Sequence, residues 1–304
     1  MSRRGWLLFV SLCLIWGIPY LLVRVALRQL EPETLICIRS LIAAGLLLPF
    51  ALRQGGLRRV LARWPWLLLF TILEMALPWL FIAHAEQRIS SSLTGLLVGA
   101  MPLIGVAVYR WMGERYRFDA RHVSGLALGF AGVAALVGVN AGSSELIGIV
   151  EMLGVALCWA VSPVVVVKRL PGLSGLGLTA AAVLLNGCIF LPLAMRHLPS
   201  PGSLSAQTWL AVLGLGVVCT AVGFLVYIAL IREAGPSRTA VVAYVNPLVA
   251  VVLGVLVLGE PLTLGIMVGM PLILVGSFLA TAPALGRRAK GKSRSLHREA
   301  AEGE

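Results

Sequence analysis

Two stretches of this chain repeat one another, and the repeat limits the folds that the chain can adopt. Thr239–Glu260, with the sequence TAVVAYVNPLVAVVLGVLVLGE, shares its layout with Thr94–Glu114, TGLLVGAMPLIGVAVYRWMGE. In each stretch the threonine stands eight residues before a Pro-Leu pair, at Pro102 and Pro247, and a Gly-Glu pair ends the apolar run. Self-similarity at a fixed offset indicates a duplicated structural unit. We therefore predict that one half of the chain folds like the other.

The repeat extends toward the start of each half. Trp16–Pro19 (WGIP) parallels Trp159–Pro163 (WAVSP). The offset between the prolines of these two segments is 144 residues, and the offset between Pro102 and Pro247 is 145. Two distant points of the chain thus keep one register, which chance similarity between apolar helices rarely produces.

Composition places the chain in a membrane. Of its 304 residues, 59% are hydrophobic and only 12% are charged, and the mean hydropathy is +0.94, whereas about 25% of the residues in a soluble domain are charged. The net charge of +12 comes from basic residues between and after the apolar runs, so it reports topology and not nucleic-acid binding. The five cysteines lie inside apolar stretches, where we interpret them as packing residues; we expect no metal and no cofactor.

The apolar runs predict ten membrane spans. A helix needs about 20 mostly apolar residues to cross the hydrocarbon core. By this measure the spans lie near residues 5–25, 34–52, 64–84, 89–109, 122–140, 146–167, 175–195, 208–231, 237–258 and 262–283. The fold class is therefore an all-α membrane protein with ten transmembrane helices.

The distribution of basic residues predicts the orientation. With the amino terminus inside, the inner loops and tail hold 20 of the 25 Lys and Arg residues, Arg39 lies within a span, and the outer loops hold Arg24, Arg28, Arg88 and Arg196. By the positive-inside rule both termini lie in the cytoplasm, with the chain in the cell (inner) membrane. Each half has five spans, an odd number, so the two repeats, 6–140 and 146–283, must be inverted relative to each other. Residues 286–304 form a polar tail that we expect to be a disordered basic cytoplasmic segment.

The chain resembles the ten-helix drug/metabolite transporter (DMT) superfamily of the EamA type. The resemblance rests on the two five-helix halves, on the Trp-Gly-x-Pro entry followed by Arg24, on Arg39 near the start of the second span, and on the helices that run from Pro-Leu to Gly-Glu. The resemblance covers roughly residues 6–283. It implies a secondary active transporter of small organic metabolites, such as amino acids, related compounds or drugs, and not an enzyme. Members export or import. Inverted repeats of this kind place the substrate site near mid-membrane at the repeat interface.

Glu74 is the principal candidate for a transport residue. It lies about 15 Å into the third span, where an acidic side chain costs about 2.5–3.5 kcal/mol. Pro78 lacks an N–H, so the main-chain carbonyl of Glu74 loses its helical partner at the same depth. The functional interpretation makes Glu74 a proton- or cation-binding group that faces a central cavity. The alternative is a neutral acid, or one paired with Arg39 to hold helices together.

Arg39 and the ninth span supply further candidates. Arg39 could bind an anionic substrate group, snorkel to the interface, or form a salt bridge with Glu74 or Glu151. Pro247 frees a carbonyl beside Tyr244 and Asn246, which offer a hydroxyl and an amide at mid-span; the alternative is a helix kink that serves packing. Other side chains that could line the cavity, or belong to the core or the interface belt, are Trp16, Tyr20, Trp79, Trp159, Asn186 and Tyr227. We expect helix breaks at Pro19, Pro78, Pro102, Pro163 and Pro247.

Small-residue pairs indicate close helix contacts. Gly125-x3-Gly129 and Gly265-x3-Gly269 fall in the equivalent fifth and tenth spans. They serve packing within one protomer or, alternatively, a dimer seam, so that the protein is a monomer or a homodimer.

Transport is the function that these patterns favour, with a small-molecule substrate and the lipid bilayer as partners and alternating access with proton or ion coupling as the mechanism. We expect export rather than import. The alternatives are a membrane-embedded lipid-modifying enzyme, which would need clustered catalytic groups at one interface, and a non-transporting membrane subunit. Motifs for a metalloprotease, a phosphate loop or a serine nucleophile do not occur in the sequence.

Overall fold

The computed structural model describes residues 1–111, 120–137 and 142–281, and these ranges are helical without a strand. The first half contains the elements α1 (Arg3–Gly17), α2 (Pro19–Ala26), α3 (Pro32–Gln54), α4 (Leu57–Leu61), α5 (Trp64–Thr71), η1 (Ile72–Ala76), α6 (Leu77–Glu86), α7 (Ser91–Val98), α8 (Met101–Trp111) and α9 (Ala120–Val137). The second half contains α10 (Ser143–Arg169), α11 (Gly175–Ala194), η2 (Pro201–Ser203), α12 (Ala206–Leu213), η3 (Gly214–Val222), α13 (Gly223–Ala234), α14 (Pro236–Thr239), α15 (Val242–Leu258) and α16 (Leu264–Thr281).

These elements confirm the predicted ten-span, all-α architecture. In the described part of the chain, seven helical runs are long and apolar enough to cross a membrane. Three shorter apolar helices, Ser91–Val106, Ala120–Leu136 and Val242–Leu258, occupy the remaining predicted spans. The tail at 286–304 and the loop around Glu114 lie outside the described residues.

The internal prolines act differently from one another. The first span changes helix at Pro19, and the fourth is interrupted just before Pro102. By contrast, α10 and α15 run through Pro163 and Pro247 without a break, so the expected interruptions there are wrong. A proline removes one main-chain bond, and packing against neighbouring helices can hold the helix together across that gap.

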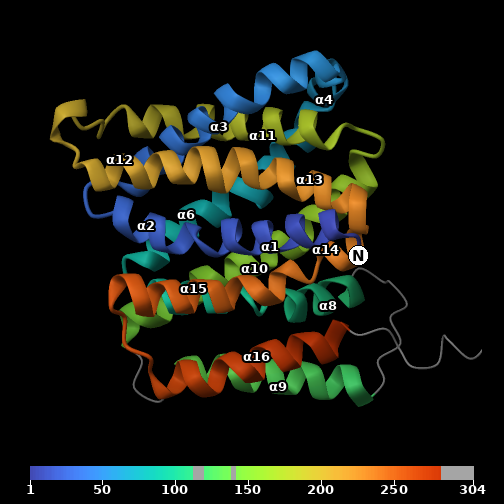
Figure 1. Ribbon diagram of the computed structural model, residues 1–304, viewed down its shortest axis with the longest axis vertical. Coiled ribbons are helices and arrows are strands. Elements are labelled where there is room, and N and C mark those ends of the chain that lie inside the picture. Colours follow the sequence, from blue (N-terminus) through green and yellow to red (C-terminus); the bar gives the residue numbers. More distant parts are fainter. Residues whose placement is uncertain (112–119, 138–141, 282–304) are drawn as a thin grey trace, which may run out of the picture.

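Equivalent helices of the two halves pair at the two ends of an elongated bundle. In Figure 1, α3 lies beside α11 at one end, and α9 lies beside α16 at the other, with the remaining spans between them. The α9–α16 pair is antiparallel: a Cβ added at Gly125 would lie 2.5 Å from the main-chain nitrogen of Ala280, and one added at Gly276 would lie 2.4 Å from that of Gly129. These glycines therefore bring α9 and α16 into close contact within one protomer, as the first of the two interpretations of their spacing has it.

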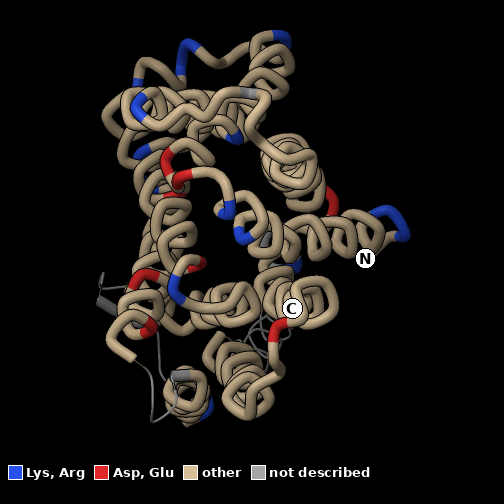
Figure 2. The backbone as a smooth tube through the Cα atoms, turned by 90° about the vertical axis from the view of Figure 1, so that its left-hand side faces the viewer, with Lys and Arg blue, Asp and Glu red and all other residues tan. Residues whose placement is uncertain are grey.

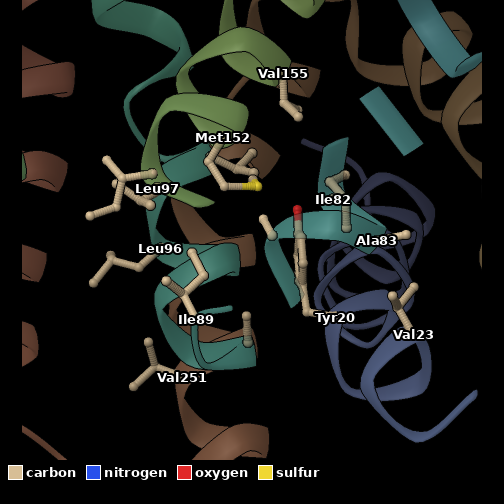
Figure 3. Close-up of a cluster of buried hydrophobic side chains, with 14 of the residues drawn as sticks. Tyr20, Val23, Ile82, Ala83, Ile89, Leu96, Leu97, Met152, Val155 and Val251 are labelled. Atoms are coloured by element: carbon tan, nitrogen blue, oxygen red, sulfur yellow. The ribbon is translucent and has the colours of Figure 1, made fainter. Parts of the chain in front are cut away.

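The bundle presents apolar side chains both inside and outside. Buried apolar residues from α2, α6, α7, α10 and α15 form one interior cluster, part of which is drawn in Figure 3. Large apolar side chains are also exposed on the outer surface, among them Leu210, Leu256 and Phe278. A surface of this kind is expected where lipid replaces water.

Candidate functional site

The third span of each repeat contains a π-helical segment. In the first repeat η1 covers Ile72–Ala76, and in the second η3 covers Gly214–Val222. Shifting η1 by the repeat offset of 144 residues places it inside η3. π-Helical turns are rare and occur frequently at functional sites. The two repeats therefore depart from α-helical geometry at equivalent places, which the sequence patterns did not indicate.

Glu74 lies in η1, and its main chain contacts the second repeat. The segment ends at Ala76, and Pro78, four residues after Glu74 in the first turn of α6, has no N–H to offer the carbonyl of Glu74. The indole Nε1 of Trp159, from α10, donates to this carbonyl across 2.9 Å. A polar group of one repeat thus satisfies the carbonyl that the proline leaves without a helical donor in the other.

The carboxyl group of Glu74 is half-buried beside groups of two other helices. It faces the Ser162 hydroxyl of α10 as a hydrogen-bonding group, and it acts electrostatically on Cys158 of α10 and on Tyr227 of α13. Ser162 is fully buried, so its hydroxyl faces Glu74 away from lipid and water. Among the described residues Glu74 forms no ion pair, so the alternative in which it pairs with Arg39 is not seen.

Aromatic side chains pack around Tyr227. Trp16 of α1 lies 5.0 Å from the ring centre of Tyr227 and 5.9 Å from that of Phe224. Trp16 also packs on Gly223, where an added Cβ would lie 2.7 Å from the indole nitrogen. We call Glu74, Trp159, Ser162, Tyr227 and Trp16 the central group: they come from η1, α10, α13 and α1, and therefore from both repeats.

Arg39 contacts an aromatic ring and a hydroxyl group. It is 7% exposed, and its guanidinium lies 3.8 Å from the ring centre of Trp79 and donates from Nη2 to the Thr220 hydroxyl at 3.1 Å. Thr220 belongs to η3 and donates in turn to the carbonyl of Leu215 at 2.8 Å. The alternative partner, Glu151, accepts instead from Arg88 at 2.9 Å. Of the alternatives for Arg39, the salt bridge to Glu74 or Glu151 is therefore not seen in the described residues.

Four predicted residues contribute to helix contacts away from the central group. The Asn246 amide, in the orientation that satisfies its neighbours, donates to the carbonyls of Cys13 and Val242 at 3.3 and 3.2 Å. Tyr244 points to the opposite side of α15, toward Ser277 and Thr281 of α16. Asn186 donates to Ser40 across the α11–α3 pair at 2.9 Å, and Tyr20 packs on Gly95 of α7.

Sequence reasoning missed a polar connection at the end of the bundle where α2, α6 and α15 end, which we call the outer end after the predicted topology. Figure 2 looks onto this end and shows acidic and basic positions together. Glu260, after α15, accepts from the main-chain nitrogens of Ser91 and Ser92 at 2.8 and 2.9 Å and from their hydroxyls at 2.9 and 2.5 Å. These residues begin α7, so an acid of the second repeat caps a helix of the first.

The environment of Glu260 favours the charged carboxylate. Burial raises the pKa of Glu260, but the hydrogen bonds from Ser92 and Ser91 outweigh it, so the pKa lies below its usual range. A signal for this contact was present in the sequence: a Ser-Ser pair begins the fourth span on the side where Gly259-Glu260 ends the ninth.

Comparison with known proteins agrees with this architecture. Residues 3–138 and 146–282 each match the model of the EamA-like transporter family. Similar proteins are the uncharacterized transporter YvbV of Bacillus subtilis (29% identity over 95% of each chain) and the uncharacterized inner membrane transporter YedA of Escherichia coli K12 (29% identity over 90% of this chain and 91% of the other). A solved structure of 21% identity superposes with a TM-score of 0.65 over 92% of this chain and 97% of its own, which shows a shared fold. The chain belongs to the EamA-like transporter family and is a multi-pass membrane protein.

Proposed function

We propose that this protein is a secondary active transporter that exports small organic metabolites by alternating access, with Glu74 as its proton-binding group. It works in the inner membrane with both termini in the cytoplasm. The observation that carries the proposal is the central group itself. Glu74 lies on a π-helical turn between the two repeats, the halves that move against each other in alternating access.

The chemistry of the central group supports a class of solute. It combines one carboxyl group with the aromatic rings of Trp16, Trp159 and Tyr227 and the hydroxyl of Ser162. A carboxylate and aromatic faces both attract an ammonium group, and the rings also offer apolar contact area. We therefore propose solutes that carry an amino group and an apolar body, such as amino acids or amine-containing drugs.

The coupling role of Glu74 is tested in vesicles reconstituted with the purified protein. An imposed pH gradient should drive accumulation of solutes from a mixture of the common amino acids and small organic amines. E74Q keeps the shape of the side chain but cannot carry the charge, so we expect accumulation to fall at least tenfold and to lose its dependence on the gradient. The control is E145Q, at an exposed position at the start of α10. Unchanged gradient dependence in E74Q would remove the coupling role.

Solute and direction require a separate experiment. The metabolites in the medium of cells with and without the gene are compared without preselection. Export predicts that at least one amino-containing metabolite accumulates outside only when the gene is present, and that E74Q abolishes the difference. Reporter fusions at each terminus check the orientation, because a cytoplasmic reporter should be active at both.

A further inference from the structure

Glu86, the last residue of α6, is a buried acid that the proposed central group does not use. Its exposed fraction is 0%, and neither carboxyl oxygen has a hydrogen-bond partner in the described part of the chain. The neighbouring residues Ile82, Ala83 and Ala85 of α6, and Ile89 just after it, are buried in the apolar cluster of Figure 3. An ionised carboxylate without a partner in such a place is far more costly than a neutral acid.

The charged groups near Glu86 are occupied with other partners. Arg24 of α2 acts on it electrostatically but donates from Nη1 to the carbonyl of Ile89 at 3.3 Å, and the two form no ion pair within the described ranges. Glu260 also acts on it, while itself bound to Ser91 and Ser92. From α2, Tyr20 faces it as well.

The other elements packed against α6 supply no partner for Glu86. On α10, Glu151 is held by Arg88 at 2.9 Å, with His84 at 3.8 Å. Arg39 of α3 is engaged with Trp79, and Glu74 of η1 lies about 18 Å away along the span by the helical rise. Glu86 is therefore a buried acid surrounded by apolar side chains. The hydrogen bonds of Glu260 with Ser91 and Ser92 close the outer end on its solvent side.

We propose that Glu86 is a second proton-binding site, which holds its proton while the outer end is closed and releases it to water when that end opens. In the closed state the side chain is a neutral carboxylic acid. When α7 and α15 separate at the outer end, water reaches the group and its O–H proton passes to water, leaving a carboxylate. The inference rests on the alternating access of the proposed function, but not on Glu74 as the coupling group.

Infrared spectroscopy of the purified full-length protein in vesicles tests the proposal without a solute. A protonated carboxyl has a C=O band that is separate from the carboxylate bands and shifts in deuterated water. We expect this band at neutral pH, its loss in E86Q, and its retention in E31Q, where an exposed acid of the same end is changed. If E86Q fails to fold, E86D should shift the band instead. A spectrum unaffected by both changes would overturn the proposal.

The band also separates this proposal from the role of Glu74. In E74Q, a contribution from Glu74 is removed, while the band of Glu86 should remain. Failure of the coupling role of Glu74 would leave the Glu86 band intact. Loss of the band in E74Q but not in E86Q would instead assign the proton to Glu74 alone and contradict the inference drawn here.

A substitution that adds bulk without changing a charge tests whether protonation of Glu86 depends on closure of the outer end. A Cβ added at Gly254 of α15 would lie 2.2 Å from the Ser92 hydroxyl oxygen and 2.4 Å from Oε2 of Glu260. G254A should therefore loosen the contact between α15 and α7 without changing a charge. We expect the carboxyl band to disappear at a lower pH than in the unchanged protein and to exchange with deuterium faster. G45A, at a site with no atom within 4 Å of the added Cβ, is the control. Equal behaviour of G254A and G45A would overturn the link.

Discussion

The indole nitrogen of Trp159 donates to the main-chain carbonyl oxygen of Glu74 across 2.9 Å, and this bond joins the two repeats at the π-helical turn of the third span. The bond fixes the height and rotation of the turn that carries the Glu74 carboxyl group. A change at Trp159 should therefore alter transport through the position of Glu74 as well as through the loss of an aromatic surface.

Trp159 can be tested by removal of its donor alone. W159F retains a ring but leaves the Glu74 carbonyl without a partner, which should cost about 1–3 kcal/mol of unfolding free energy. Thermal unfolding in detergent and gradient-driven accumulation in vesicles should both decline. P78A restores an N–H that can bond this carbonyl, so W159F should cost less in a P78A background. W6F, at an exposed position of α1, is the control. An equal cost in both backgrounds would contradict the role of the bond.

The spans were predictable because their signal is local. Each depends on a continuous apolar run, and the helices begin and end within a few residues of the predicted limits. The freed carbonyl of Glu74 was predictable for the same reason, because it follows from Pro78 four residues later. Its partner was not, since Trp159 lies 85 residues away in the sequence and only packing brings the two together.

The hydrogen-bond and stacking partners of polar side chains inside the bundle could not be predicted, because they depend on how each helix is rotated about its axis, which the sequence pattern does not determine. Arg39 had two acids as possible partners, but it meets Trp79 and Thr220, the latter 181 residues away. Glu86 stands at the end of a span, where an acid is ordinarily solvated, yet here it is sealed. The prediction of a helix break at every internal proline was wrong, because a well-packed helix can continue although one main-chain hydrogen bond is missing.

Arg39 is expected to contribute to stability through both of its contacts. R39Q removes the stacking on Trp79 and the charge on the bond to Thr220, and we expect a loss of about 1–3 kcal/mol. R39K should not restore it, because an ammonium lacks the planar face that stacks on the indole. A double-mutant cycle with T220V measures the bond itself. A coupling near zero would show that Thr220 does not bind Arg39.

The glycines of the α9–α16 pair should tolerate no side chain. G276A places a methyl group 2.4 Å from the main-chain nitrogen of Gly129, so the two helices must separate. We expect thermal destabilisation equivalent to about 1–3 kcal/mol. The matched control is again G45A in α3, where the added methyl meets nothing and a helical Gly→Ala change gains about 0.5–1 kcal/mol. If the glycines instead formed a dimer seam, G276A would change the oligomeric state with little effect on monomer stability.

Glu260 should make the closure between α7 and α15 sensitive to acid. Its folded-state pKa lies below the ordinary value of 4.5, because hydrogen bonds from Ser92 and Ser91 to the carboxylate outweigh the effect of burial. A lowered folded-state pKa contributes stability that is complete above about 4.5, declines as the pH falls through the folded-state value, and is absent below it. E260Q removes the charge that these donors bind and should cost about 1–3 kcal/mol at neutral pH.

The pH dependence separates this contribution from a loss of shape at Glu260. Thermal unfolding of the wild type and E260Q, followed from neutral pH into acid, should show a difference that is constant above about 4.5 and shrinks as the wild type takes up its proton. E31Q controls for the general effect of acid on an exposed carboxylate at the same end. A difference that persists unchanged at the lowest pH would mean that the charge of Glu260 does not hold α7. Because the charged form is the one that binds Ser91 and Ser92, acid should favour opening of the outer end.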